Sequence, residues 1–151
     1  MKHFRAHLGN VQDIALNHNG TLLATVSNDK MAKIFDVVNF DMINIIKLGY
    51  VPECACWVHR SGDALPKLAV AEADSTKIHI YDGRSGDAPL LHSAEKLHMK
   101  PVVAMAYSPA HDVVISADQV CDLSHYSKNI VTTSDYHCIN FIAIARDNNF
   151  F

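Results

Sequence analysis

The chain has 151 residues, enough for one ordinary domain with a sizeable core, and its 49% hydrophobic and 19% charged residues are typical of globular proteins. A formal net charge of −3 argues against a broadly basic surface for nucleic acid or anionic membranes. Four cysteines are too few for a disulfide scaffold, no apolar signal segment follows Met1, and no stretch reaches the ~18 apolar residues of a membrane helix. The composition therefore predicts a soluble, intracellular protein.

The N-terminal part of the chain predicts four short antiparallel strands joined by polar turns. Residues 22–27 are apolar at nearly every position, as expected of a strand covered on both faces, and residues 31–35 alternate between two sides. Gly20 stands in a turn that needs a positive φ, and Asp29 is expected to accept backbone hydrogen bonds in the next turn. The other two strands of this unit are expected at residues 11–16 and 42–48.

This order of apolar run, aspartate turn and alternating strand recurs along the chain. The turn aspartates Asp29, Asp74 and Asp118 are 45 and 44 residues apart. Two aromatic–aspartate pairs that close strands, Phe35–Asp36 and Tyr81–Asp82, are 46 residues apart. A repeat of roughly 40 to 45 residues with four strands is the period of a WD40 propeller blade. We therefore predict an all-β fold, a partial WD40 β-propeller of about two and a half four-stranded antiparallel blades.

After Asp118 the repeat pattern stops, because no further aromatic–aspartate pair follows. A strand at residues 140–145 is favoured by propensity, but the sequence suggests no partner for it. We expect residues 119–151 to be a divergent, poorly ordered tail. An open stack leaves blade faces unpaired, so we expect a partial product, such as a truncated gene model, with poor solubility and weakly cooperative unfolding. The repeat region is expected over residues 1–118, with units at about 7–48, 51–93 and 98–118.

WD40 blades carry a buried network in which a His, a Ser or Thr, an Asp and a Trp are hydrogen-bonded. Such a network fixes strand spacing and performs no chemistry, because buried polar groups must be paired. By resemblance to these blades, His7 and Asp29 fill two of the roles in the first unit. Either Thr25 or Ser27 fills the third role, and Phe35 stands at the tryptophan position.

The other two units match the same pattern less completely. Tyr81 replaces the tryptophan of the second unit, whose histidine position falls near Pro52 and Glu53. In the third unit the third strand is missing, but the first three roles are matched. The residues predicted to be structural members of the repeat are His7, Ser27, Asp29, Phe35, Asp36, Asp74, Tyr81, Asp82, His98, Ser116 and Asp118.

Four segments resemble one family more closely than they resemble a generic repeat. These segments are KHFRAHLG from Lys2, KIFDVVNFDMINIIKLGYVP from Lys33, KIHIYDGRSGDAPL from Lys77 and KLHMKPV from Lys96. From Lys2 to about residue 118 the chain resembles the nuclear, spliceosome-associated cyclophilins with an N-terminal WD-repeat domain, the peptidylprolyl isomerase domain and WD repeat-containing proteins.

This resemblance implies a protein-interaction scaffold in the nucleus, with spliceosomal proteins as its partners. The family's isomerase activity belongs to a separate cyclophilin domain with F-H-R and Q-G-G motifs, and neither motif occurs in this chain. We therefore expect no catalytic residue, cofactor, metal or small-molecule substrate, and no direct binding to nucleic acid or membrane. The alternative is peptidyl-prolyl cis-trans isomerase activity, as in the full-length family. A weaker alternative is direct RNA binding, which the net charge disfavours.

Two other kinds of site fit the sequence less well. Cys54, Cys56 and His59 suggest a zinc site, but no second pair of ligands follows, which favours buried cysteines that act as small apolar residues. A hydrolase triad could be assembled from His7, Asp29 and Ser27, but no G-x-S-x-G elbow is present. The repeat explains these polar residues better than catalysis does.

Overall fold

The computed structural model describes residues 5–60, 62–84, 90–95, 97–119 and 137–143, the last segment by its backbone only. The described residues form eleven strands in three antiparallel sheets and contain no helix, so none is available that could cross a membrane. Sheet 1 contains β1 (Val11–Leu16), β2 (Leu22–Ser27), β3 (Met31–Asp36) and β4 (Asp41–Lys47). Sheet 2 contains β5 (Pro52–Val58), β6 (Lys67–Glu72), β7 (Ile78–Asp82) and β8 (Leu90–Ala94). Sheet 3 contains β9 (Val102–Ser108), β10 (Val113–Gln119) and β11 (His137–Ala143).

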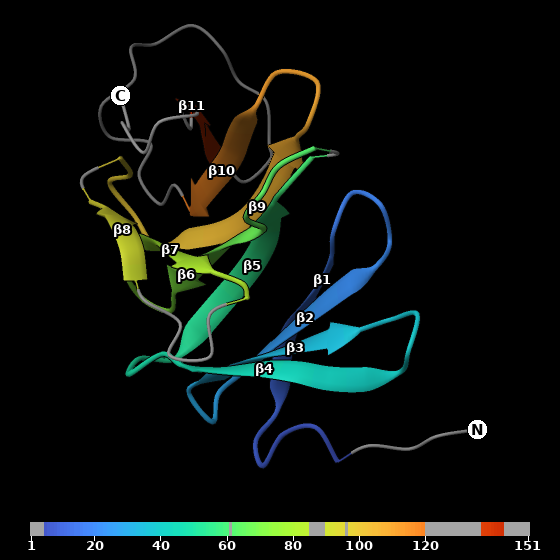
Figure 1. Ribbon diagram of the computed structural model, residues 1–151. Coiled ribbons are helices and arrows are strands. Elements are labelled where there is room, and N and C mark those ends of the chain that lie inside the picture. Colours follow the sequence, from blue (N-terminus) through green and yellow to red (C-terminus); the bar gives the residue numbers. More distant parts are fainter. Residues whose placement is uncertain (1–4, 61, 85–89, 96, 120–136, 144–151) are drawn as a thin grey trace, which may run out of the picture.

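The three sheets are arranged as successive blades of a propeller. Sheets 1 and 2 are four-stranded meanders in which each strand pairs with the next along the chain. The first strand of each sheet is its inner edge, and β5 contacts both β1 and β9, as Figure 1 shows. Strands β4 and β8 lie at the outer edges. This architecture confirms the predicted all-β, partial WD40 propeller.

Local sequence explains how each unit turns. Gly20 and Gly62 have φ values of +73° and +98°, a region that glycine enters without the steric cost of a Cβ. In the turn between β2 and β3, the Asp29 carboxylate accepts the backbone N–H of Met31 at 3.2 Å, as the sequence predicted. The Asp29 side chain thus holds the tight turn that reverses the chain.

Two layers of apolar side chains hold the sheets together. One layer lies between sheets 1 and 2 and is built from residues such as Ile34 and Leu68. The other lies between sheets 2 and 3 and includes Cys56, Ile80 and Val114. Cys54 and Cys56 belong to this second layer, in agreement with the prediction of buried strand cysteines. Each sheet therefore buries a face that a single meander could not bury alone.

Part of the predicted tail joins the third sheet. Strand β11 pairs with β10 in continuous antiparallel register, from Val113 opposite Ala143 to Gln119 opposite His137. The sequence suggested no partner for a strand in this region, and the structure supplies β10. The sequence did not predict this pairing because no aromatic–aspartate pair marks the strand. The hydrogen bonds of the ladder are made by the backbone and do not require such a pair. The other residues of the predicted tail, 120–136 and 144–151, lie outside the described residues.

Candidate functional site

The first polar network joins the segment before β1 to the β2–β3 turn. The His7 ring lies with Nε2 at 2.8 Å from the Thr25 hydroxyl and Nδ1 at 3.0 Å from the Asp29 carboxylate. The same carboxylate accepts the backbone N–H of Leu8 at 3.0 Å. Burial alone would raise the pKa of Asp29, but the bonds from Leu8, His7 and Ser27 and the nearby His7 ring together hold that pKa below its ordinary value.

Thr25, and not Ser27, is the hydroxyl that contacts the histidine. The sequence left both residues open for this role, and Ser27 stood in the predicted set. In the structure the Ser27 hydroxyl instead accepts the backbone N–H of Asp29 at 3.2 Å. Thr25 and Ser27 are two residues apart on β2, so they lie on the same face but are displaced along the strand by one full pleat. Only Thr25 is therefore level with the His7 ring.

The third sheet repeats this network with one difference of position. His98 Nε2 lies 2.6 Å from the Ser116 hydroxyl, and His98 Nδ1 lies 3.1 Å from the Asp118 carboxylate. The backbone N–H of Met99 donates to Asp118, as that of Leu8 does to Asp29. Asp118, however, lies within β10, two positions before the place that the spacing of the first unit assigns to it. All three side chains are buried, so the bonds hold the sheet.

The second sheet uses a different set of polar residues. Val70 stands where the other sheets have their hydroxyl, and His79 on β7 is its cross-strand partner. Its Nδ1 lies 2.7 Å from the Ser93 hydroxyl, and its Nε2 lies 3.4 Å from the Glu72 carboxylate. The Tyr50 ring stacks on His79 with centroids 4.6 Å apart. This cross-strand cluster takes the place of the network, whose pattern the sequence of the second unit matches less completely.

The predicted aromatic–aspartate pairs lie where the third strands end. Phe35 is partly buried in sheet 1, and Tyr81 is buried with its hydroxyl 3.0 Å from that of Tyr50. Asp36 accepts the backbone N–H groups of Val38 and Asn39 in the following turn, and Asp82 accepts that of Arg84. The hydrogen bonds from Asn39 and Val38 lower the pKa of Asp36. Asp74 occupies the β6–β7 turn with a φ of +55°.

Neither alternative chemical site is assembled. Among the described residues no three His, Cys, Asp or Glu side chains could hold a metal ion. Burial raises the pKa of both Cys54 and Cys56 to about 12, which opposes the thiolate form that binds zinc. The hydrolase triad is also not formed. The Ser27 hydroxyl accepts the backbone N–H of Asp29, and the ring nitrogen of His7 that a serine would need is bonded to the Thr25 hydroxyl.

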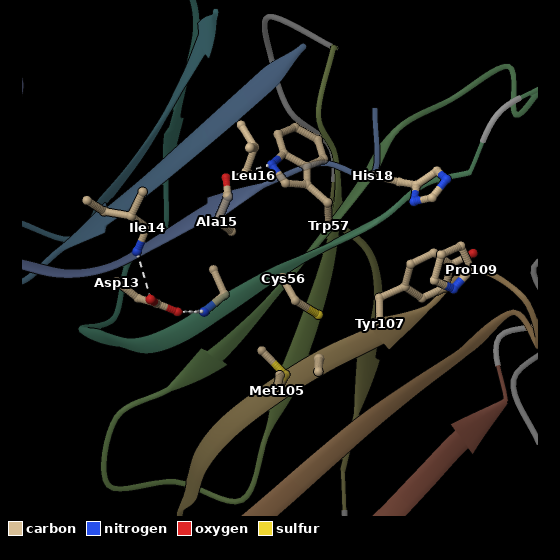
Figure 2. Close-up of a pocket in the computed structure, with 12 residues that line it drawn as sticks. Asp13, Ile14, Ala15, Leu16, His18, Cys56, Trp57, Met105, Tyr107 and Pro109 are labelled. Atoms are coloured by element: carbon tan, nitrogen blue, oxygen red, sulfur yellow. Dashed lines mark hydrogen bonds between the residues drawn. The ribbon is translucent and has the colours of Figure 1, made fainter. Parts of the chain in front are cut away.

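A groove of about 340 Å³ runs along the inner strands and crosses all three sheets. Its most prominent side chains are Leu16 from β1, Trp57 from β5, and Met105 and Tyr107 from β9, with His18 at one end (Figure 2). Strands β1, β5 and β9 are edge strands of their sheets, so their outer backbone groups face this groove. Tyr107 donates to the Asp112 carboxylate at 2.7 Å, and burial together with this bond raises the pKa of Tyr107.

The walls of this groove are fixed by bonds between sheets. Trp57 Nε1 donates to the Ala15 carbonyl at 3.1 Å, and the Ala55 N–H donates to the Asp13 carboxylate at 2.9 Å. Sequence reasoning did not identify the groove. A signal was present in the repeat register, which places Leu16, Trp57 and Tyr107 at the same position of successive inner strands.

Comparison with known proteins gives a consistent assignment. The profile of the family described as WD domain, G-beta repeat matches residues 1–36. The peptidyl-prolyl cis-trans isomerase cyp15 of Rhizopus delemar is 43% identical over 127 residues, covering 84% of this chain and 20% of that protein. Peptidylprolyl isomerase domain and WD repeat-containing protein 1 of Homo sapiens is 45% identical over 119 residues, covering 79% of this chain and 18% of that protein.

A plant relative shows the same extent of similarity. Peptidyl-prolyl cis-trans isomerase CYP71 of Arabidopsis thaliana is 44% identical over 126 residues, covering 83% of this chain and 20% of that protein. The chain thus spans about a fifth of the length of these curated relatives. Together with the three sheets and their recurring networks, these matches show that the chain belongs to the WD-repeat proteins and is homologous to the peptidylprolyl isomerase domain and WD repeat-containing proteins.

Proposed function

We propose that this chain is a protein-binding WD-repeat scaffold that performs no catalysis of its own. The groove across β1, β5 and β9 is the observation that carries this proposal. Its strand edges offer backbone donors and acceptors, and the partly exposed Tyr107 offers aromatic surface beside them. An extended segment of a partner protein has the matching chemistry, since it presents both backbone groups and side chains.

The polar residues of the repeat support a structural role. The histidines His7 and His98 each spend both ring nitrogens on bonds within their own sheet. A general base or acid needs a proton-transfer atom directed at a substrate. The family resemblance of the sequence favours a spliceosomal protein as the partner and the nucleus as its location.

The only tryptophan of the chain provides a direct test of groove binding. Trp57 lines the groove, so its fluorescence should change when purified spliceosomal proteins are titrated one at a time into the chain. His18→Ala should weaken the interaction at least several-fold, because His18 is an exposed groove residue. Asn19→Ala is the matched control, since Asn19 is exposed beside His18 but does not line the groove. Equal effects of the two variants would refute the groove as the contact surface.

Isomerase activity is the second candidate, because the relatives are named as peptidyl-prolyl isomerases. A proline-peptide isomerisation assay on the purified chain separates the two candidates. We expect the uncatalysed rate. Catalysis that a cyclophilin ligand inhibits would overturn the proposal of a non-catalytic scaffold.

A further inference from the structure

We propose that the turn between β3 and β4 is a docking element that inserts Val38 and Phe40 into an apolar pocket of a partner protein, and that basic side chains border this pocket. The proposal rests on the protein-binding function proposed above and adds a contact surface outside the groove, because no residue of the turn lines the groove. The turn lies beyond the ends of two neighbouring strands and not on a sheet face, so the stacking of sheets does not cover it (Figure 1).

Both apolar side chains of this turn are largely exposed to solvent. Val38 is 67% exposed and Phe40 62%, and neither belongs to the two apolar layers between the sheets. In sheet 2 the exposed Arg84 holds the position equivalent to Val38. The backbone N–H of this arginine donates to the Asp82 carboxylate as that of Val38 donates to Asp36. The turn is therefore formed equally well with a charged residue, and it does not itself require an apolar one.

Phe40 also holds a backbone conformation that a bulky residue rarely adopts. Its φ is +56°, in the left-handed region where Gly20 and Gly62 stand in other turns of the chain. An aromatic residue with a Cβ is strained in this region. Strain and exposure both disfavour phenylalanine here as far as stability is concerned. Backbone outliers of this kind cluster at sites that bind a partner or ligand, which points to a binding role for Phe40.

Hydrogen bonds fix the shape in which the turn presents these side chains. The Asp36 carboxylate accepts the backbone N–H of Val38 at 2.8 Å, and it accepts the backbone N–H and side-chain amide of Asn39 at 3.0 and 2.8 Å. The N–H of Val37 donates to the Thr21 carbonyl at 2.9 Å, which joins the turn to the start of β2. A turn held in this way loses little conformational entropy when it binds.

The charges of the turn indicate the chemistry of its partner. Asp36 and Asp41 flank the two apolar residues, and none of residues 36–41 is basic. Carboxylates at these positions repel the phosphates of nucleic acids and of anionic membranes. They complement an apolar pocket that has lysine or arginine at its rim. A protein surface can supply both parts of such a site, since interfaces combine an apolar centre with a polar rim.

Isothermal titration calorimetry of the full chain with purified spliceosomal proteins, added one at a time, tests this surface. We expect Phe40→Asn to weaken the binding of at least one of them about 30-fold or more, the loss typical of a hot-spot residue. Asparagine enters the left-handed region more readily than phenylalanine, so the variant should melt within about 3 °C of the wild-type chain. Truncation of a core aromatic residue would instead lower the melting temperature by about 10 °C or more.

Two further variants make the test specific. Leu8→Asn is the matched control, since Leu8 is 84% exposed but contacts the β2–β3 turn, at the other end of β3. This variant should bind like the wild-type chain. Asp41→Asn examines the basic rim, because Asp41 is exposed beside Phe40. It should weaken the same interaction about threefold and make binding less sensitive to salt.

The outcomes separate this surface from the groove. Binding that weakens with His18→Ala but not with Phe40→Asn supports the groove and overturns the proposal for the turn, whereas the reverse pattern supports the turn and overturns the groove. Equal losses with Leu8→Asn and Phe40→Asn also overturn the proposal, as does a melting temperature of Phe40→Asn lower by about 10 °C, which marks a structural role.

Two more results would contradict a docking turn that recognises a protein. If none of the spliceosomal proteins binds, this surface and the scaffold function fail together. Cosedimentation with phosphatidylcholine vesicles that Phe40→Asn abolishes would identify a membrane contact in place of a protein pocket, and it would overturn the proposal as well.

Discussion

Gly83 is the position where the structure makes its sharpest prediction about packing between strands. A Cβ added there would lie 2.6 Å from Cζ3 of Trp57, 2.9 Å from its Cη2 and 2.9 Å from the Pro66 carbonyl oxygen. The ring cannot move freely, because Trp57 is buried and bonded to Ala15. Gly83→Ala should therefore overpack the layer between sheets 1 and 2 and cost about 1–3 kcal/mol of unfolding free energy. This corresponds to a melting temperature lower by about 2–10 °C.

Urea unfolding followed by circular dichroism measures this loss, and Trp57 emission reports the local displacement. We expect a lower unfolding midpoint and a shifted emission maximum in the folded state. Gly49→Ala is the control, since Gly49 has a φ of +75° and no atom within 4 Å of an added Cβ. It should destabilise through backbone strain, by about 1 kcal/mol, with unchanged emission. Unchanged emission and midpoint in Gly83→Ala would refute the packing of Trp57 against this loop.

Three further predictions concern titration and reactivity. The pKa of Asp29 is lower when folded than its ordinary value of 3.8, so its contribution to stability is present at neutral pH and is lost as pH falls through the folded pKa. Asp29→Asn should therefore make stability depend less steeply on acid pH, as monitored by circular dichroism. An unchanged acid unfolding profile would contradict this. The pKa of Tyr107 is raised by burial and by its bond to Asp112, so Tyr107→Phe should remove one phenol from those that ionise only on alkaline unfolding, measured by absorbance at alkaline pH. Burial raises the pKa values of Cys54 and Cys56 to about 12. In a chain that also carries Cys121→Ser and Cys138→Ser, thiol reagents at pH 8 should therefore react slowly with the folded protein and fast in urea. Fast reaction without denaturant would count against the burial of these two cysteines.

The repeat itself was readable from the sequence because its signals are local. Turn chemistry at Asp29 and Gly20 depends on a few neighbouring residues, and the structure has both as predicted. The period of the aspartates predicted the stacking of the sheets, since each meander must bury a face against another. Alternation in β3 likewise predicted that Ile34 and Lys33 face opposite sides, and in the structure Ile34 is on the buried side.

The contacts between strands could not be read in the same way. Whether Thr25 or Ser27 meets His7 depends on the register of β2 against a loop, which local pattern does not determine. The His79 cluster is built from residues of three strands and from Tyr50, so no single sequence motif predicts it. Strand β11 lies 18 residues after β10 ends, and its pairing is a backbone property that leaves little trace in side-chain identity.

Ser116→Ala tests the central claim most directly, namely that the recurring polar residues hold the sheets together. The Ser116 hydroxyl is buried and lies 2.6 Å from His98 Nε2, so its removal leaves a buried ring nitrogen without this partner. Equilibrium unfolding should show a loss of about 1–3 kcal/mol. The exposed bond of Ser108 to His111 supplies the control, for which Ser108→Ala should cost less than about 0.5 kcal/mol. Equal stability of Ser116→Ala and the wild-type chain would contradict the claim.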